Sequence, residues 1–562
     1  MNSIAAGFVA LAVVLAGVQF ATLRHTIPPP DAITYFEVAD QISRVGYAAA
    51  LPLHWSPLYP LYALTARRLG SASLDRELSV TAAADAVALV ALCVVVVLVF
   101  RSLSRLCWPD DRAPGRAWLS YAGGAAVFLA FGILRVGLRM PDVLVAGLAV
   151  TTLWLWCQAS ARRLDARWGA AAGIASGAAF LARANLLHWS VAVGVLACVL
   201  APGAGMRRRA QAFASFCVGL LLVAGPQTYL LSSARGSFVW GESGRMAFAI
   251  AHGATWPAGA PAWPVRRADG DVRLFTGTHE VGFPGFYEPG REFDDATVTL
   301  GWRSAIRAMA RASAWCLMGN ASPSFALMWP LLWAAWPALL FGLGDWRRRS
   351  RSEKAGDGRA TLRRRLAWLF ILAGAAGVGM HLLTFCNGYY MPPYFIASFT
   401  GIGLLMLDAR TDPGIAHRYR AAHVVGIGFA VAATLLTLRY YRSSEAHVRE
   451  RNLAEAHAMA DALRPFPPDE SGLRKIAVAG YWLGLYGIRL SNSQVAADLP
   501  DAAVLGDRAR LARALAVLRT EGIVALLGPT AALKNAGIPA RPIGGGQWSV
   551  VDLRSIPPGP AT

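Results

Sequence analysis

The sequence lacks charge, and acidic residues above all. Only 16% of its 562 residues are charged and 55% are hydrophobic, whereas a soluble protein carries about 25% charged residues. Mean hydropathy is +0.41, so we expect lipid to be the solvent of much of the chain. The 54 Lys and Arg residues outnumber the 34 Asp and Glu residues. Because the basic residues cluster in short loops between apolar runs, they indicate an anionic membrane surface, and we expect no nucleic-acid partner.

Metal-binding and disulfide patterns are also missing. The seven cysteines lie mostly inside or near the ends of apolar runs, and no pair has metal-ligand spacing. We therefore predict neither a disulfide framework nor a zinc site. Asp294 and Asp295 form one acidic pair without other ligands, which leaves a divalent metal conceivable but unsupported, so we assign no metal and no other cofactor. No Lys or Arg precedes the first apolar run, which we interpret as a retained helix rather than a cleaved signal peptide.

Long apolar runs dominate what is present. A spanning helix needs about 20 mostly apolar residues, and by this measure we predict an α-helical polytopic membrane protein with about eleven transmembrane helices. The runs are centred on Ile4–Leu23, Thr81–Phe100, Trp118–Leu134, Val143–Ala159, Trp168–Leu181, Leu186–Leu200, Phe213–Leu231, Phe325–Phe341, Leu366–Phe385, Pro392–Leu407 and Ala421–Leu438. The run at Trp168–Leu181 is short and rich in Ala and Gly, which favours close helix packing.

Basic residues mark alternate loops. Counted from the first helix, every even loop carries an arginine cluster, such as Arg207, Arg208 and Arg209, and the odd loops carry none that compares. The positive-inside rule then places the N-terminus in the cytoplasm, and an odd number of spans places the C-terminus outside. The Ala- and Arg-rich composition is typical of a GC-rich bacterium. We therefore predict a multi-pass protein of the bacterial inner (cytoplasmic) membrane, with its C-terminal part in the periplasm.

The expected outer regions are residues 24–79, residues 232–324 and the tail. In the tail, helical and strand-like segments alternate, which predicts a small α/β domain. The segments are the helical Glu445–Leu463 and Asp507–Leu518 and the strand-like Lys475–Ala479, Ile523–Leu527 and Trp548–Leu553. We accordingly divide the chain into a transmembrane domain, residues 1–439, and an extracytoplasmic α/β domain, residues 440–562.

The first outer loop, PPPDAITYFEVADQISRVGYAAALPLHWSPLYPLYAL, carries the strongest candidate. Prolines end the first helix, and Asp31 stands where a helix N-cap would be. Asp31 and Tyr35 follow the helical spacing of a segment that ends at Gly46. A carboxylate here lies at headgroup depth, where a lipid phosphate would also lie. The alternative is an ordinary helix cap, and we interpret Glu37 and Asp40 as solvated helix charges.

Sugar transfer from a polyprenyl phosphate suits such a place, because the lipid tail is buried and the phosphate is not. The reaction needs a base to take a proton from the acceptor hydroxyl and cations to stabilise the departing phosphate. One carboxylate beside one or more arginines at the outer rim meets both needs. Asp31 is the candidate base, and the arginines at the outer ends of the helices are the candidate cations.

Arginine is disfavoured on the outer side, so the arginines there require a reason. Arg135 and Arg139 lie in one short outer turn before Asp142, and Arg183 and Asn185 lie in another. We predict that the three arginines bind the donor phosphate and that Asp142 and Asn185 contact substrate. The alternatives are arginines that extend to lipid headgroups, and an Asp142 that caps its helix or pairs with Arg139.

Two later segments supply further candidates. The segment TLGWRSAIRAMARASAWCL repeats Arg303, Arg307 and Arg311 every four residues beside apolar side chains, which is typical of an interfacial helix. We add Arg303 and Arg307 to the phosphate ligands; plain membrane anchoring is the alternative. The turn NGYYMPPY places Tyr389 and Tyr390 at the outer end of the ninth helix as substrate contacts, with an aromatic belt as the alternative.

The first loop also resembles a known family. The pattern consists of Asp31, Tyr35, Ala39, Gly46 and the segment His54–Pro60. It is similar to that of membrane glycosyltransferases of the GT-C fold, in the branch of protein O-mannosyltransferases, aminoarabinose transferases and lipopolysaccharide-core sugar transferases. The segment Leu181–Leu187 is similar to a family segment at the outer end of a middle helix. The resemblance implies a GT-C-like fold and inverting transfer, with Asp31 as base, and we add Tyr35 and His54 to the substrate contacts.

The function that these patterns favour is a glycosyltransferase that uses a polyprenyl-phosphate sugar as donor. Its acceptor is an envelope glycan, lipid or protein, and membrane lipids are further partners. One alternative is an envelope glycan polymerase or ligase, which would use outer arginines without needing Asp31. Another is a transporter or flippase of lipid-linked substrates, which the absence of a sequence repeat disfavours. A further alternative is a non-enzymatic envelope scaffold that binds partners through its outer tail. Its function would be unchanged by substitution of Asp31.

Overall fold

A computed structural model gives the architecture of the chain. It describes residues 2–25, 27–28, 30–50, 55–70, 73–107, 139–201, 203–241, 265–269, 272–275, 306–307, 310, 358–383, 394, 396–398, 400–401, 404, 446–470, 472–479, 485–499, 502–544 and 546–556. The predicted runs Trp118–Leu134, Phe325–Phe341 and Ala421–Leu438 lie outside these residues, as does most of Pro392–Leu407. The total of about eleven spans therefore stays a prediction.

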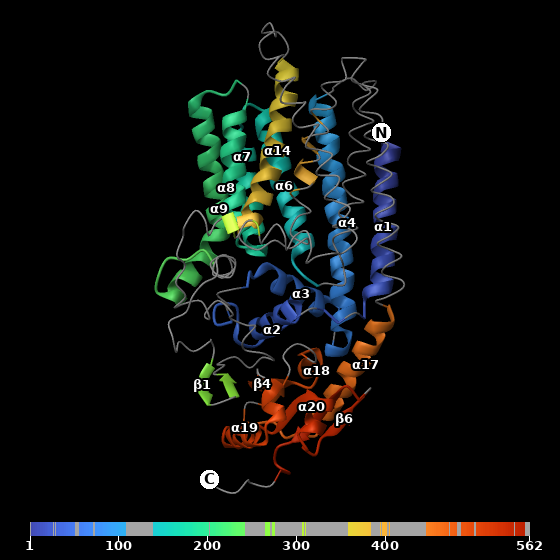
Figure 1. Cartoon of the computed structure of the whole chain (residues 1–562). Helices are drawn as coiled ribbons and strands as arrows, with labels where there is room; N and C mark the ends of the chain where they lie inside the picture. Colours follow the sequence, from blue (N-terminus) through green and yellow to red (C-terminus); the bar gives the residue numbers. More distant parts are fainter. Residues whose placement is uncertain are drawn as a thin grey trace.

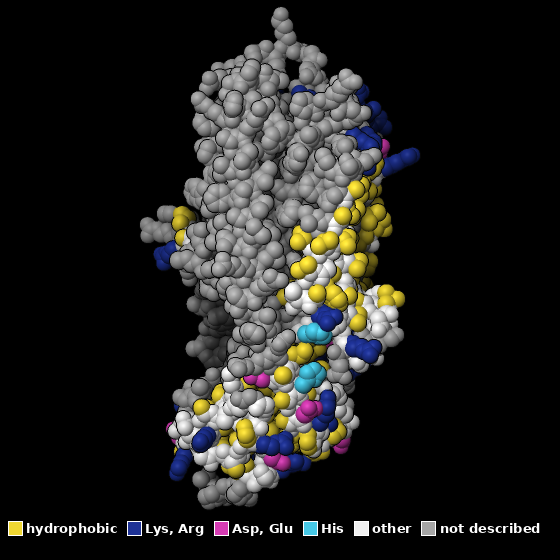
Figure 2. All heavy atoms as spheres, turned by 90° about the vertical axis from the view of Figure 1, so that its right-hand side faces the viewer, with side chains coloured by type: hydrophobic (Ala, Val, Ile, Leu, Met, Phe, Trp, Pro, Cys, Tyr) yellow, Lys and Arg dark blue, Asp and Glu magenta, His cyan; other side chains and the backbone are white. Residues whose placement is uncertain are grey.

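Long apolar helices stand side by side in an upright bundle (Figure 1). They are α1 (Asn2–Leu23), α4 (Leu74–Cys107), α6 (Asp142–Ala161), α7 (Ala166–Ala182), α8 (Leu186–Leu200), α9 (Met206–Arg235) and α14 (Gly358–Leu383). Each contains or coincides with a predicted apolar run, except α14, which contains all but the last two residues of the run Leu366–Phe385. Within the described residues, Arg76–Cys107, Asp142–Ala161 and Met206–Arg235 are the three helices long and apolar enough to cross a membrane. Among the residues coloured in Figure 2, apolar side chains predominate along the upright part, and basic, acidic and histidine side chains mix with apolar ones over the lower part.

Helices α7 and α9 pack with almost no side chain between them. A Cβ added to Gly173 would lie 2.1 Å from the carbonyl oxygen of Phe216, and one added to Gly219 would lie 2.3 Å from that of Ala170. Glycine is thus required on both helices for this backbone approach, as is common at helix interfaces in membranes. The close packing predicted from the Ala and Gly content of Trp168–Leu181 is confirmed.

Two short helices lie below the bundle, between it and the sheet (Figure 1). Helix α2 (Pro30–Val45) follows α1, and α3 (Leu58–Leu69) leads into α4. Proline is favourable in the first turn of a helix because that turn needs no N–H donor, and an acidic residue there suits the helix dipole. The helix therefore begins at Pro30, and Asp31 lies in its first turn.

A seven-stranded sheet forms the end of the molecule farthest from the bundle, with strand order β1-β2-β4-β3-β5-β7-β6 (Figure 1). Its strands are β1 (Val265–Asp269), β2 (Val272–Phe275), β3 (Arg474–Ala479), β4 (Ser493–Leu499), β5 (Ala525–Pro529), β6 (Arg541–Ile543) and β7 (Trp548–Asp552). Strand β3 pairs in parallel with β4 and β5, and the outer pairs are antiparallel. The hairpin β1–β2 comes from the region that sequence reasoning treated only as an outer loop.

Helices cover the sheet. They are α17 (Ala446–Leu463), α18 (Leu485–Leu490), α19 (Arg508–Thr520) and α20 (Thr530–Asn535), with a short 3-10 helix at Ala502–Gly506. The five segments predicted in the tail all appear, with ends that differ by a few residues. The assignment of residues 440–562 to one domain stays a prediction, and below we call this sheet with its helices the α/β part.

Candidate active site

A buried ion pair joins two of the upright helices at their lower ends. Asp142 is the first residue of α6, and Arg183 directly follows α7 in an extended conformation. Arg183 Nη2 lies 2.8 Å from Asp142 Oδ1, and the two side chains are only 14% and 5% exposed. The structure thus pairs Asp142 with Arg183, and not with Arg139, the partner considered from the sequence.

Asp31 belongs to the same cluster. Burial raises the pKa of its carboxyl above the usual value; the positive charge of Arg183 lowers that pKa, and the negative charge of Asp142 raises it further. Three elements therefore converge: the first turn of α2, the start of α6 and the turn between α7 and α8. The result is a site with two carboxyl groups and one guanidinium, and the predicted residues Asp31, Asp142 and Arg183 all lie in it.

The turn that carries Arg183 is held by the first loop. The backbone N–H of Ala184 donates a hydrogen bond to Ser56 Oγ at 3.1 Å, so the Ser56–Pro57 segment fixes the turn. Asn185 stands at the N-terminus of α8. Its Oδ1 and the Oδ2 of Asp142 are buried acceptors, and no donor from the described residues satisfies either of them. Both atoms are suited to accept hydrogen bonds from a ligand rich in hydroxyl groups.

Aromatic side chains support α2 beside this cluster. Tyr35, one helical turn after Asp31, is buried and makes edge contacts with the rings of Trp55 and Tyr59, at centroid distances of 5.0 and 5.3 Å. The hydroxyl of Tyr59 donates a hydrogen bond to Asp85 Oδ2 on α4 at 3.0 Å. These ring contacts hold Tyr35 against Trp55 and Tyr59, and its role as a substrate contact stays a prediction.

Arg139 has a different environment. Its side chain is 0% exposed, and its φ of +49° is rare for a residue other than glycine. Its Nη2 donates to the carbonyl oxygens of Leu23, Arg24 and Leu78 at 2.8 to 3.1 Å. Arginine here satisfies backbone groups at the end of α1 and in α4, so these contacts are structural.

Of the remaining predicted site residues, the structure describes only Arg307, which is exposed. The others lie outside the described residues, namely Arg135, His54, Arg303, Tyr389 and Tyr390. As for metals, no group of three or more His, Cys, Asp or Glu that could hold an ion occurs among the described residues. The pair Asp294 and Asp295 also lies outside them.

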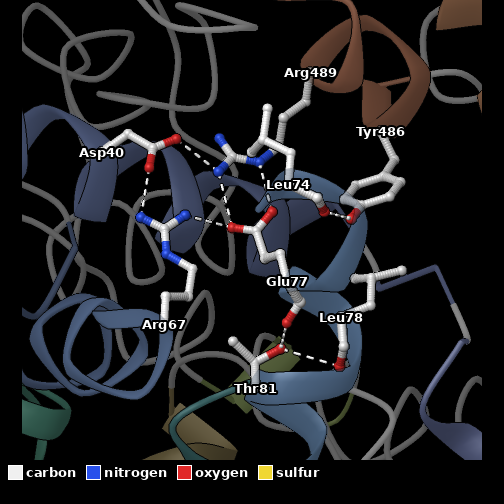
Figure 3. A network of polar contacts seen from close by, with 8 residues as sticks. All are labelled: Asp40, Arg67, Leu74, Glu77, Leu78, Thr81, Tyr486 and Arg489. Carbon is white, nitrogen blue, oxygen red and sulfur yellow. Dashed lines mark hydrogen bonds and ion pairs between the residues drawn. The ribbon is translucent and has the colours of Figure 1, made fainter. Parts of the chain in front are cut away.

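One prediction about the first loop is wrong. Glu37 and Asp40 were interpreted as solvated charges, but Glu37 is 2% exposed and the Asp40 side chain 21%. Asp40 belongs to a closed ring of ion pairs with Arg67, Glu77 and Arg489 (Figure 3). Sequence reasoning missed this ring because Arg489 comes from α18, far along the chain.

The charges of the ring are balanced. Arg67 bridges Asp40 and Glu77 at 2.5 Å each, and Arg489 bridges the same two carboxylates at 2.6 and 2.9 Å. A second hydrogen bond, from Arg489 Nε to Glu77 Oε2 at 3.1 Å, makes that contact bidentate. Burial raises the pKa of Asp40, but Arg489 and Arg67 outweigh that effect and hold it below the usual value.

Comparisons with known proteins identify the fold. No protein-family model matches the sequence, and no curated protein matches it either. The architecture is nevertheless that of the GT-C fold. ArnT from Cupriavidus metallidurans bound to undecaprenyl phosphate is 14% identical, with a TM-score of 0.54, over 99% of this chain and 98% of that chain. The apo form of ArnT is also 14% identical, with a TM-score of 0.51, over 97% of each chain.

An archaeal protein is similar at a lower score. The oligosaccharyltransferase AglB from Archaeoglobus fulgidus, in complex with an inhibitory peptide and a dolichol-phosphate, is 13% identical with a TM-score of 0.49. That match covers 94% of this chain and 69% of AglB. At these identities the matches concern the fold, and the chemistry of this chain is argued from its own residues.

Proposed function

We propose that this protein is an inverting glycosyltransferase that moves a sugar from a polyprenyl phosphate to a hydroxyl of a glycan, lipid or protein acceptor outside the cytoplasmic membrane. The observation that carries the proposal is the convergence of Asp31, Asp142 and Arg183 at one end of the bundle. It is supported by the GT-C fold, shared with an ArnT structure that holds undecaprenyl phosphate. The described α2, α3 and α/β part all lie at this same end, which fits one large outer face.

In the proposed reaction, the Asp31 carboxylate accepts the proton of the acceptor group. The acceptor atom attacks the anomeric carbon from the side opposite the phosphate and forms the new glycosidic bond. The bond between that carbon and the phosphate oxygen breaks, and its electron pair leaves on the polyprenyl phosphate. Attack from the opposite side inverts the configuration at the anomeric carbon. A base and a cation at the leaving group are the groups that this chemistry needs.

Arg183 is the proposed cation for the leaving phosphate. Its pairing with Asp142 at 2.8 Å fixes its direction, and the nearby unsatisfied acceptors of Asp142 and Asn185 suit sugar hydroxyls. Arg139 contributes indirectly, because its guanidinium binds backbone carbonyls of α1 and α4. The other phosphate ligands that we propose from the sequence are Arg135, Arg303 and Arg307, and the other substrate contacts are Tyr35, His54, Tyr389 and Tyr390.

The test is the variant Asp31→Asn in the full chain, expressed where the native gene has been deleted. It keeps the size of the side chain and removes the base, so we expect the glycan product to fall by a factor of about 100 to 10,000, which is the usual contribution of a positioned base. Membrane abundance and undecaprenyl phosphate binding should stay near the wild-type level. Asp461→Asn serves as the matched control, because that side chain is 64% exposed. Unchanged glycan at normal abundance of Asp31→Asn would remove Asp31 from catalysis.

A further inference from the structure

Helix α2 has two opposite faces, and each is buried against a different part of the protein. At about 100° per residue, Phe36 points about 140° and Asp40 about 180° away from Asp31 around the helix axis. Asp31 therefore faces the site below the bundle. Ile33 and Phe36 belong instead to the apolar core that includes Met459 and Val550 of the α/β part. The helix is a rigid connection between the two.

Arg489 of the α/β part provides the polar contacts with α2, beside the apolar contacts of Ile33 and Phe36. Its side chain is 5% exposed, and it reaches Asp40 on α2 and Glu77 on α4 together. Its guanidinium also lies over the ring of Phe36, 5.8 Å from the centroid. Because a guanidinium fork fixes direction as well as distance, this contact sets where α2 lies along α4 and how it is rotated.

Without Arg489 the ring is out of balance. Asp40 and Glu77 would share Arg67 alone. A buried carboxylate without a counter-ion is unfavourable. Water can hydrate the Asp40 carboxylate only if α2 moves away from its buried position. Movement of α2 also moves Asp31, which is part of the same helix.

We infer that the α/β part holds helix α2 in place, with Arg489 as a positioning residue that keeps Asp31 beside Arg183. The role of Asp31 in this statement rests on the proposed function. The attachment of α2 does not, so the two are tested separately. Arg489 contacts Asp40 and Glu77, and its effect on Asp31 passes through them.

The experiment uses the full chain in lipid nanodiscs. Hydrogen exchange of α2, Pro30–Val45, is compared with that of α8, Leu186–Leu200, which serves as the internal reference. For Arg489→Gln we expect exchange in α2 to become about tenfold to a hundredfold faster, as the loss of charged hydrogen bonds predicts, and no change in α8. Arg464→Gln is the matched control, because Arg464 lies in the same part of the chain with a side chain 56% exposed.

Two further variants separate positioning from misfolding. The double variant Glu77→Gln with Arg489→Gln removes one charge of each sign and leaves the 2.5 Å pair of Arg67 and Asp40 intact. It should reach the membrane at wild-type abundance and still exchange faster in α2. Arg489→Lys keeps the charge without the fork, so it should restore only a small part of the glycan product that Arg489→Gln loses.

The outcomes are distinct. If α2 exchanges at the wild-type rate in both Gln-containing variants, the α/β part does not hold it and the inference is overturned. If α2 is loosened and the glycan product falls at normal abundance, the inference stands in full. Binding of undecaprenyl phosphate to the wild-type chain is the separate arm. Its failure would remove the proposed donor, while the exchange data would still decide whether Arg489 holds α2.

Discussion

Removing the positive charge from the candidate site gives the sharpest measurable prediction. Arg183→Gln leaves Asp142, whose side chain is 5% exposed, without its partner at 2.8 Å. Removing one member of a buried ion pair costs about 3–5 kcal/mol, because the remaining charge is neither solvated nor compensated. Asp31 loses the same neighbouring charge, so the free energy of unfolding should fall by an amount in that range.

The double variant Asp142→Asn with Arg183→Gln tests the physical reason. It removes both charges, and the amide groups retain the capacity to hydrogen-bond. Its free energy of unfolding should therefore exceed that expected from the sum of the two single effects by about 0.5–3 kcal/mol, the coupling found for residues in contact. Denaturant unfolding of the detergent-solubilised chain, followed by tryptophan fluorescence, measures each value. Arg207→Gln, at an exposed position, should stay within about 0.5 kcal/mol of the wild type.

Two results would refute this reasoning. One is a loss of less than about 1 kcal/mol for Arg183→Gln, which is what an exposed pair would give. The other is strict additivity of the two single variants, which would mean that Asp142 and Arg183 do not interact in the folded protein. In either case the cluster would not be preorganised for a leaving phosphate.

Further predictions concern helix packing, pH and the turn at Arg183. Gly173→Ala should destabilise the protein by about 1–3 kcal/mol, because the added Cβ would be too close to the backbone of Phe216. Gly225→Ala is the control, because nothing lies within 4 Å of its added Cβ. Equal unfolding midpoints for the two variants would contradict the close approach of α7 and α9 at Gly173. Asp31 must be ionised to act as base, and burial raises its pKa above the usual value of 3.8. The rate of glycan transfer should therefore be lost as the pH falls through a pKa higher than that of free aspartate. A transfer rate that stays constant down to pH 3.8 would exclude Asp31 as the base. Ser56→Ala removes the hydrogen bond to Ala184 and should cost about 1 kcal/mol in unfolding; an unchanged midpoint would show that the turn is held by other contacts.

The sequence predicts the parts of this structure that local rules govern. Helices α6 to α9 follow apolar runs, because lipid requires every spanning residue to satisfy its backbone within the helix. Arg183 was found from the positive-inside rule, since an arginine in a short outer turn needs a reason. Asp31 was found from its place after the prolines that end the first helix. The helices and Asp31 need only the neighbouring residues, and Arg183 needs in addition the charge pattern of alternate loops.

The parts that were missed depend on contacts between distant segments. Asp40 looks like an exposed helix charge until Arg489 and the α/β part cover it. Arg139 and Asp142 lie three residues apart, yet one binds backbone carbonyls and the other pairs with Arg183. The positive φ of Arg139 sets its direction, and no residue pattern announces that angle. Strands β1 and β2 join a sheet whose other members begin about 200 residues later, which short-range periodicity does not encode.

The ion ring has a consequence for how the protein is made. Arg489 lies 412 residues after Glu77, so a ribosome adds it roughly 20–80 s later at the usual rates of synthesis. During that interval Asp40 and Glu77 have Arg67 as their common counter-ion. A polypeptide cut short before α18 would keep this imbalance permanently and expose the apolar side of α2. Only a chain that extends through α18 supplies the second counter-ion of Asp40 and Glu77, so copies cut short before α18 differ from longer ones in the charge balance of α2.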